Sequence, residues 1–179
     1  GFLTLSGYSM IAVSNAIEAL RMANRLAGEE VYAWSVLSLD GEPVLSSNGL
    51  SLAPTHSVKT SPRFDVVFVG GGVDVRAATG AALLTWLRQQ ARQGVALGAL
   101  CTGTFALAEA GLLRGYRRAI HWENLSSIRE EFPEIDITDD LFVIDRNRLT
   151  CTCGLAPLDM MLKIIASRYG MARVNAIPT

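Results

Sequence analysis

The stretch VALGALCTGTFALA, residues 95–108, decides the fold of this chain. Its first part, residues 95–100, has the length and apolar composition of a buried strand, and its second part starts a helix with apolar residues at Phe105 and Ala108. Cys101 stands between the two. A residue in such a strand-to-helix turn displays its side chain at the carboxyl edge of a sheet, which is the geometry of a nucleophile elbow.

Cys101 has two interpretations. A thiol at this position would face the positive end of the following helix, which favours the thiolate, and Gly103, which has no side chain, would let the turn pack closely. The alternative is a small buried cysteine that fills space in the core. Because α/β proteins bind ligands where a strand ends and a helix begins, we favour a functional site at Cys101.

The composition fits one globular domain. The chain has 179 residues, 50% of them hydrophobic, and its 16 Lys and Arg against 17 Asp and Glu leave no basic excess that would indicate nucleic-acid binding. The three cysteines lack the spacing of metal ligands. A small, odd number of cysteines fits a protein of a reducing, cytoplasmic compartment. No apolar run has transmembrane length, and no signal peptide is visible. Since the chain begins with Gly1 rather than Met, we expect it to be a piece of a longer protein.

The rest of the sequence alternates predicted strands and helices. Strands are expected at residues 2–5, 31–39, 65–69, 95–100, 119–122, 135–138, 141–145 and 148–151, with short extended segments at 44–45 and 50–52. Helices are expected at residues 9–26, 81–93, 123–132 and 155–169 and after the elbow, and a loop at 55–62. Helices between buried strands predict an α/β fold whose mainly parallel sheet has helices on both faces.

Two further features point to the edge of the sheet where Cys101 lies. Three glycines at 70–72 follow the buried strand at 65–69, where backbone amides can approach a ligand, although a plain strand-to-helix turn explains them equally well. They lack the full dinucleotide fingerprint and the P-loop lysine. His121 ends an apolar strand and should stand near Cys101, whereas His56 is expected in a solvated loop. A cysteine beside a histidine is the minimal activated-thiol pair, but a hydrogen-bonded structural histidine also fits this spacing.

These features and several longer motifs resemble the class I glutamine amidotransferase-like superfamily. The motifs are AIEALRMANRL at 16–26, SLDGEPV at 38–44, SNGL at 47–50, GGG at 70–72, ALCTG at 99–103, IHWE at 120–123 and TCTCGLAPLD at 150–159. Within the superfamily the chain is more similar to the PfpI-type branch. It is most similar to the N-terminal domains of a set of AraC-family transcriptional regulators, over nearly its whole length.

The resemblance implies a flavodoxin-like sandwich in which residues 1–179 form a single amidotransferase-like domain. In the family this domain senses a small molecule, usually dimerises, and is joined to a C-terminal helix-turn-helix domain that binds DNA and that this chain lacks. We therefore expect a cytoplasmic, homodimeric effector-binding domain that contacts DNA only through the missing domain and has no membrane partner. The implied effector is a small nitrogen-containing metabolite such as an amino acid or a betaine-like amine, and no cofactor or metal is expected.

The resemblance also assigns site residues by position. Cys101 matches the family's nucleophile, and His121 matches its histidine. Gly72 and Thr102 match the residues whose backbone amides form an oxyanion pocket. Together with Gly71, these residues are the expected ligand-binding set.

Departures from the family pattern argue against catalysis. Many PfpI-type hydrolases have a histidine directly after the cysteine, where this chain has Thr102, and a glutamate early in the first helix, near Ala12 here. Glu123 alternates to the far side of the strand from His121, so no acid is evidently paired with that histidine. A nucleophile without an aligned base and acid loses most of its advantage. A cysteine hydrolase, amidase or deglycase that uses Cys101 and His121 stays as the alternative, and a dimerisation module with a vestigial pocket is a third hypothesis.

A cationic effector would need aromatic or carboxylate groups around it, because a quaternary ammonium is held by cation–π contact and charge. Tyr8, Glu18, Trp122 and Glu123 are conceivable suppliers. Packing in the core and exposure at the surface explain the same four residues equally well.

Overall fold

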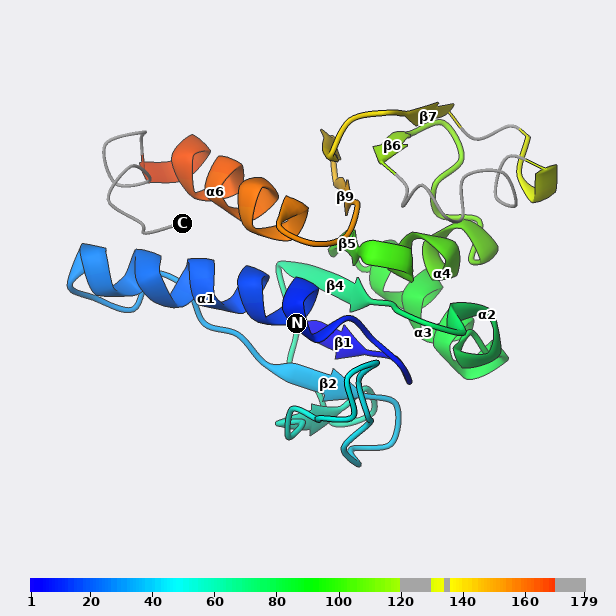
Figure 1. The fold of residues 1–179 in the computed structure, drawn as a ribbon, viewed down its shortest axis with the longest axis horizontal. Helices are drawn as coiled ribbons and strands as arrows, with labels where there is room; N and C mark the ends of the chain where they lie inside the picture. The colour runs from blue at the N-terminus through cyan, green and yellow to red at the C-terminus, as the bar shows by residue number, and fades with distance from the viewer. Residues whose placement is uncertain (120–129, 134–135, 170–179) are drawn as a thin grey trace.

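A computed structural model describes residues 1–119, 130–133 and 136–169 of the chain (Figure 1). The strands are β1 Phe2–Thr4, β2 Val36–Ser38, β3 His56–Ser57, β4 Val66–Gly70, β5 Ala96–Leu100, β6 Arg117–Ala119, β7 Asp136–Thr138, β8 Phe142–Asp145 and β9 Arg148–Cys151. The helices are α1 Met10–Ala27, α2 Val75–Ala78, α3 Ala81–Arg92, the 3₁₀ turn Cys101–Gly103, α4 Thr104–Glu109 and α6 Ala156–Tyr169. Within these described ranges no helix is both long and apolar enough to cross a lipid bilayer.

The main sheet is mostly parallel, as the sequence predicts. Its seven strands lie in the order β3-β2-β1-β4-β5-β9-β8, and only the β8–β9 pair is antiparallel. A second, two-stranded sheet pairs β6 with β7. Gly70 on β4 is in register with Leu100 on β5, and Ala99 on β5 with Thr150 on β9. These three strands therefore end at one edge of the sheet, where the elbow lies.

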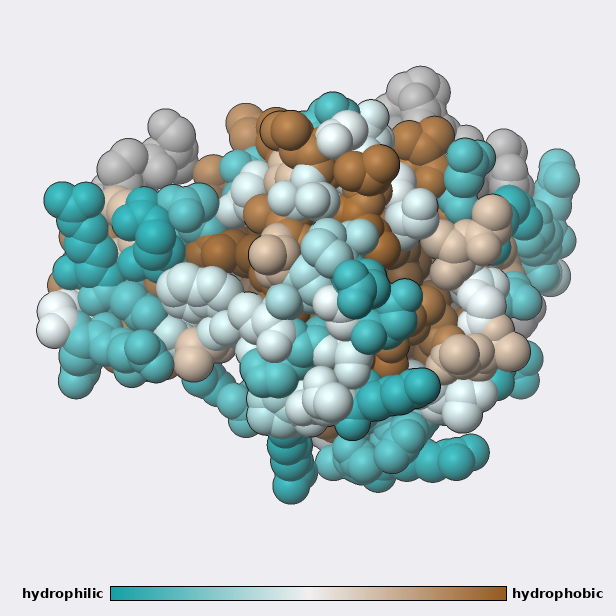
Figure 2. All heavy atoms as spheres, turned by 90° about the horizontal axis from the view of Figure 1, so that it is seen from below, coloured by the Kyte–Doolittle hydropathy of each residue, from teal (hydrophilic) through white to brown (hydrophobic). Residues whose placement is uncertain are grey.

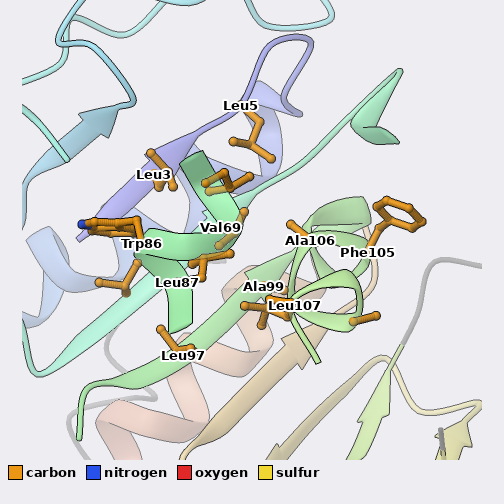
Figure 3. Close-up of a cluster of buried hydrophobic side chains, with 14 of the residues drawn as sticks. Leu3, Leu5, Val69, Trp86, Leu87, Leu97, Ala99, Phe105, Ala106 and Leu107 are labelled. Atoms are coloured by element: carbon orange, nitrogen blue, oxygen red, sulfur yellow. The ribbon is translucent and has the colours of Figure 1, made fainter. Parts of the chain in front are cut away.

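Helices cover both faces of the sheet because the central strands are apolar on both sides. Along β4, Val67 and Val69 point to one face and Phe68 to the other, as the two-residue period of a strand requires. Helices α3 and α4 cover the first face, where Leu87 and Leu107 join the core (Figure 3). Helices α1 and α6 pack side by side over the second face (Figure 1). The predicted two-faced sandwich is confirmed.

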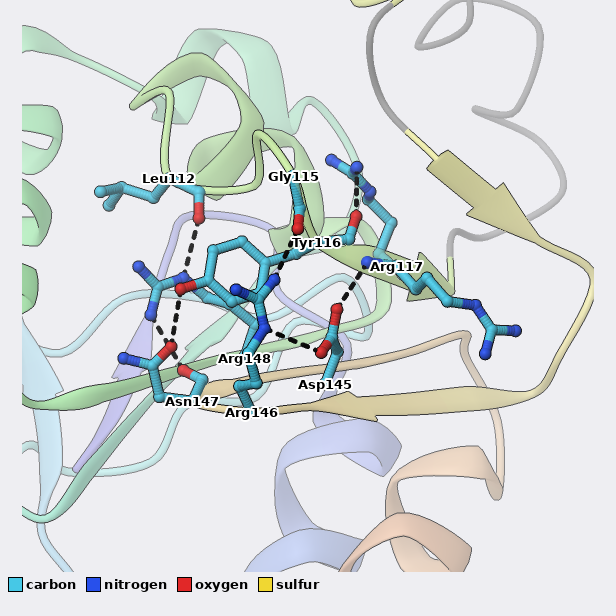
Figure 4. A network of polar contacts seen from close by, with 9 residues as sticks. Leu112, Gly115, Tyr116, Arg117, Asp145, Arg146, Asn147 and Arg148 are labelled. Atoms are coloured by element: carbon cyan, nitrogen blue, oxygen red, sulfur yellow. Dashed lines mark hydrogen bonds and ion pairs between the residues drawn. The ribbon is translucent and has the colours of Figure 1, made fainter.

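A polar network fixes the β8–β9 hairpin against the segment that follows α4 (Figure 4). The ring of Tyr116 lies between two guanidinium groups, 3.9 Å from Arg146 and 4.8 Å from Arg148, measured from the ring centroid to Cζ. Its hydroxyl donates a 2.9 Å hydrogen bond to Asn147 Oδ1. Hydrogen bonds from Arg146 and from the Arg117 backbone hold the pKa of Asp145 below its ordinary value. The network therefore fixes the start of β9, the strand that pairs with β5, and the elbow lies at the end of β5.

The structure corrects several element boundaries. The strand predicted at 31–39 is only β2, and the predicted loop at 55–62 contains β3. Helix α2 was not predicted. The segments 44–45 and 50–52 form no strand. The Leu45 carbonyl accepts from Gly7 N, and Leu52 N donates to the Tyr8 hydroxyl.

The predicted strand 119–122 and helix 123–132 fall mainly outside the described residues. The described part of the first is the end of β6, which already begins at Arg117. Of the second, residues 130–131 are helical.

We predict that Gly98→Val will lower the free energy of unfolding by about 1–3 kcal/mol because it overpacks the core. A Cβ at Gly98 would overlap the Phe68 ring, which is buried and stacked on Phe2 with centroids 5.4 Å apart. Urea unfolding followed by circular dichroism measures the change.

The matched control is Gly80→Ser. A Cβ at Gly80 meets open space, and serine suits the N-cap position that Gly80 occupies before α3. Its unfolding free energy should stay within about 0.5 kcal/mol of the parent. If Gly98→Val were equally neutral, the close contact between β5 and Phe68 would be wrong.

Candidate functional site

Cys101 occupies a strained strand-to-helix turn, which confirms the predicted elbow. It follows the last residue of β5 and opens the 3₁₀ turn that continues into α4. Its φ angle is +57°, in the left-handed region that residues other than glycine seldom adopt. Such a conformation costs about 1–3 kcal/mol and persists only where the surroundings impose it.

The surroundings of Cys101 impose the turn through backbone contacts at two glycines. A Cβ on Gly103 would collide with the carbonyl oxygen of Val69, and a Cβ on Gly71 would collide with the amide nitrogen of Gly103. Gly71 N also donates to the carbonyl of Leu100, at 3.2 Å. The end of β4 and the elbow therefore touch main chain to main chain, a contact that side chains at 71 and 103 would prevent.

The third glycine of the triplet, Gly72, packs against the loop before α1. A Cβ on Gly72 would collide with the carbonyl oxygen of Gly7, which itself accepts a 3.1 Å hydrogen bond from Val73 N. Thr102 Oγ1 donates to the Gly72 carbonyl oxygen at 2.7 Å. Close packing thus explains why these positions are glycines, and it also brings residues 71, 72, 101 and 102 together as expected. His121, the remaining member of the predicted set, lies outside the described residues.

Cys101 is bonded to Cys153, a partner that no sequence pattern indicated. The two residues form a disulfide with Cα atoms 4.4 Å apart, within the range that disulfides span. Cys153 lies in the turn between β9 and α6. Because β5 and β9 are parallel neighbours, the residues that follow them meet at one edge of the sheet. The order of strands in the sheet would have indicated this pair, but that order could not be derived from the sequence.

The two bonded sulfurs differ from the third cysteine in their environments. Cys101 is 4% exposed and Cys153 is partly exposed, whereas Cys151 is completely buried. Cys151 Sγ donates to the Ala99 carbonyl oxygen at 3.5 Å. Burial raises the pKa of the Cys151 thiol to about 12, and a hydrogen bond with the Cys101 backbone offsets only part of that rise. Cys151 is therefore a core residue and a weak nucleophile.

The described candidates for binding a cation have structural roles. Tyr8 is fully buried, and its hydroxyl accepts a 3.0 Å hydrogen bond from Leu52 N. Desolvation raises the pKa of Tyr8, while the bond from Leu52 acts in the opposite direction. Glu18 lies on an exposed face of α1 and pairs with Arg21 at 2.7 Å. The other two candidates, Trp122 and Glu123, lie outside the described residues.

The structure also describes Ala12 and His56, two residues considered in the sequence analysis. Ala12, near the position where the family resemblance places a glutamate, is fully buried in the cluster that contains Cys101. His56 is on the edge strand β3 rather than in a loop, is partly buried, and has its Nδ1 3.2 Å from Thr55 Oγ1.

Charge beside the elbow comes from α2. The Arg76 guanidinium lies 4.6 Å from the centroid of the Phe105 ring and forms a bidentate pair with Glu131. Its hydrogen bonds hold the pKa of Glu131 below the ordinary value. Among the described residues, no three His, Cys, Asp or Glu side chains gather in a way that could hold a metal ion.

An open groove of about 1040 Å³ lies away from the elbow, between residues 58–63 and helix α3. Lys59, Arg63, Trp86 and Gln90 are among its lining residues. None of the residues at 71, 72, 101 and 102 lines it. The groove is therefore a separate surface that any test of ligand binding must distinguish from the elbow.

A mainly parallel sheet, helices on both faces and a cysteine in a strained turn at the carboxyl edge define a flavodoxin-like sandwich with a nucleophile elbow. A sequence profile of the DJ-1/PfpI family matches residues 2–167. The chain belongs to the DJ-1/PfpI family.

Several proteins similar to this chain are transcriptional regulators. The chain is 47% identical over 177 residues to the HTH-type transcriptional regulator GbdR of Pseudomonas aeruginosa, covering 99% of this chain and 48% of GbdR. It is 43% identical over 169 residues to the regulator CdhR of the same species, covering 94% of this chain and 50% of CdhR. The crystal structure of an AraC family transcriptional regulator from Pseudomonas putida superposes with a TM-score of 0.87 at 32% identity, covering 97% of this chain and 94% of that one. The chain spans about half the length of the curated relatives it matches.

We predict that reducing the Cys101–Cys153 bond will lower the free energy of unfolding by about 3–4 kcal/mol, because the bond closes a loop in the unfolded chain. The sequence separation is 52 residues. Urea unfolding with and without dithiothreitol measures the difference.

A Cys151→Ser variant should keep this sensitivity to the reductant, whereas Cys153→Ser should lose it. Unfolding curves of the parent that coincide with and without reductant would show that the bond does not form.

Proposed function

We propose that this chain is the effector-binding domain of an AraC-type transcriptional regulator. The observation that carries the proposal is the similarity to such regulators along almost the whole chain. The described surroundings of the elbow, with Cys101 bonded to Cys153 and a buried methyl group at Ala12, support it. The rest of the regulator, including a C-terminal helix-turn-helix domain that contacts DNA, belongs to the same proposal, and so does a cytoplasmic location.

The elbow suits binding better than catalysis. A cysteine nucleophile needs a thiolate, a base and an orienting acid. Here Cys101 is bonded to Cys153, Thr102 directs its hydroxyl to the Gly72 carbonyl, and Ala12 replaces the acid of the first helix. Cys151 is no substitute, since burial keeps its thiol protonated at neutral pH.

The effector site we propose is formed by Gly71, Gly72, Cys101, Thr102 and His121. The described members lie within one turn of the elbow and are linked by hydrogen bonds. Main-chain amides at the start of the elbow helix suit the carboxylate of an amino acid or a betaine-like amine, because they are hydrogen-bond donors. A nitrogen-containing metabolite of this class is the proposed effector.

We predict that a thermal-shift screen of amino acids and amines will find a stabilising ligand. A ligand present at about 100 times its dissociation constant adds about 2.7 kcal/mol, which is roughly 5–10 °C for a domain of this size. Thr102→Trp should abolish the shift by filling the site, since Thr102 is partly exposed at the elbow.

The matched control is Arg63→Ala in the separate groove, which should leave the shift unchanged. The reverse result, with Arg63→Ala abolishing the shift and Thr102→Trp retaining it, would move the effector to the groove. Turnover of an amide, ester or glyoxal substrate that Cys101→Ser removes would instead support the hydrolase, amidase or deglycase alternative, because a serine hydroxyl is a much weaker nucleophile than a cysteine thiol.

A homodimer is the second part of the proposal, and exposed apolar side chains around the elbow support it. We define the apolar rim as Ile11, Leu45, Leu50, Val73 and Leu155, which are 51–64% exposed. Val73 follows Gly72, Leu45 contacts the Gly7 loop through a backbone hydrogen bond, and Leu155 follows the Cys153 turn. On the face that Figure 2 shows, hydrophobic side chains gather between hydrophilic ends of the molecule. An exposed apolar patch is typical of an interaction surface.

We predict that the 19.3 kDa chain will sediment as a dimer. A stable interface buries about 1,600 Å² in total, and a charge at its apolar part opposes burial. Leu45→Glu and Val73→Glu should therefore shift the protein to monomer. Leu26→Glu, at the far end of α1 and 39% exposed, should not. A monomeric parent at high concentration would refute the dimer.

A further inference from the structure

The disulfide at the elbow gives this domain chemistry that effector binding does not use. We propose that Cys101 and Cys153 form a reversible dithiol–disulfide couple, oxidised by hydroperoxides and reduced by small thiols. Oxidation then locks the elbow to the turn that begins α6.

The sheet holds the two cysteines together whether or not they are bonded. Strand β5 is paired with β9 through Leu97, Gly98 and Ala99, and Cys101 follows β5 as Cys153 follows β9. The Cα atoms are 4.4 Å apart. In the reduced protein the thiols therefore remain neighbours, and the second step of oxidation is an intramolecular reaction with a high effective concentration.

Breaking the bond leaves the sheet intact, because both cysteines lie beyond the paired residues of their strands. Each side also keeps hydrogen bonds of its own. Thr102 Oγ1 donates to the Gly72 carbonyl at 2.7 Å on the elbow side. Asn15 Nδ2 on α1 donates to the Gly154 carbonyl at 3.4 Å on the other side. The two turns can therefore part and rejoin without unfolding.

Reductants and oxidants reach the pair through Cys153. Cys153 is partly exposed, while Cys101 is 4% exposed. A small thiolate attacks the Cys153 sulfur, the Cys101 sulfur leaves as a thiolate, and a second thiol releases Cys153 from the mixed disulfide.

Oxidation balances with a hydroperoxide as the electron acceptor. One thiolate attacks the peroxide oxygen, the O–O bond breaks, and a sulfenic acid and an alcohol form (water, when the oxidant is hydrogen peroxide). The second thiol attacks the sulfenic sulfur, the S–S bond forms, and water leaves. Two thiols lose two electrons and two protons in total, and one hydroperoxide is reduced.

The third cysteine does not compete for either partner. Cys151 is buried and hydrogen-bonded to the Ala99 carbonyl, and its thiol stays protonated near neutral pH because burial raises its pKa to about 12. Disulfide exchange requires the thiolate, so the pairing of Cys101 with Cys153 is selective.

Reversibility also fits the location that goes with the proposed regulatory function, and to that extent the inference rests on it. Disulfides in a reducing cytoplasm are usually transient and either catalytic or redox-sensing rather than permanent. The bond joins the elbow to the first turn of α6, and α6 packs along α1. Its redox state therefore acts on the helix pair that covers one face of the sheet.

The test is a thiol titration of the purified domain, which needs no effector and so remains informative if the proposed regulator function fails. Reduced protein is treated with one equivalent of hydrogen peroxide, alkylated and mapped by mass spectrometry. We expect loss of two of the three free thiols and a peptide pair that joins 101 to 153. Excess reduced glutathione should restore all three thiols in the folded protein.

Three variants, each with one cysteine replaced, test which two cysteines form the couple. Cys151→Ser, which keeps a donor for the Ala99 carbonyl, should behave like the parent. Cys153→Ser and Cys101→Ser, each checked for folding by circular dichroism, should form no intramolecular bond. Amide hydrogen exchange at residues 154–158 should be slower in the oxidised parent than in the reduced parent.

Two results would overturn the proposal. A bond that excess reduced glutathione leaves intact in the folded protein would show that the pair is not a reversible couple. Peroxide that leaves Cys101 and Cys153 unbonded, or joins either of them to Cys151, would show that the pair is not a couple.

Discussion

Contact between main chains at the elbow is the constraint on which the rest of the site depends. The end of β4 and the start of the 3₁₀ turn approach so closely that only glycine fits at Gly71 and Gly103. This contact holds Cys101 at a φ angle of +57°, at a cost of about 1–3 kcal/mol. The surrounding parallel strands, buried on both faces, provide the rigidity that maintains it.

Environment, rather than residue type, separates the three cysteines. Cys151 ends β9 inside the core, where low polarity keeps its thiol neutral. Cys101 and Cys153 lie just beyond the ends of neighbouring strands, in turns that bring their sulfurs together. The elbow of this DJ-1/PfpI domain has a buried methyl group at Ala12, and on our proposals it is an effector site to which the paired sulfurs add redox chemistry.

The sequence predicts well those features that local pattern controls. The apolar run at 95–100 and the helix after it placed Cys101 in its turn, because a buried strand followed by small residues has few other conformations. The bond to Cys153 could not be predicted, since it depends on β9 lying beside β5, a pairing of distant segments. The strand expected at 31–39 shortened to β2 because tertiary contacts, rather than β propensity, decide which of its residues pair.

The central claim is that the elbow is a binding site for a small effector. A crystal structure of the domain grown with the amine or amino acid that stabilises it most would test the claim directly. The account predicts ligand density against Gly72, Cys101 and Thr102, at the carboxyl edge of β4 and β5. Density for the ligand in the groove beside Arg63 and Trp86, with the elbow empty, would contradict it.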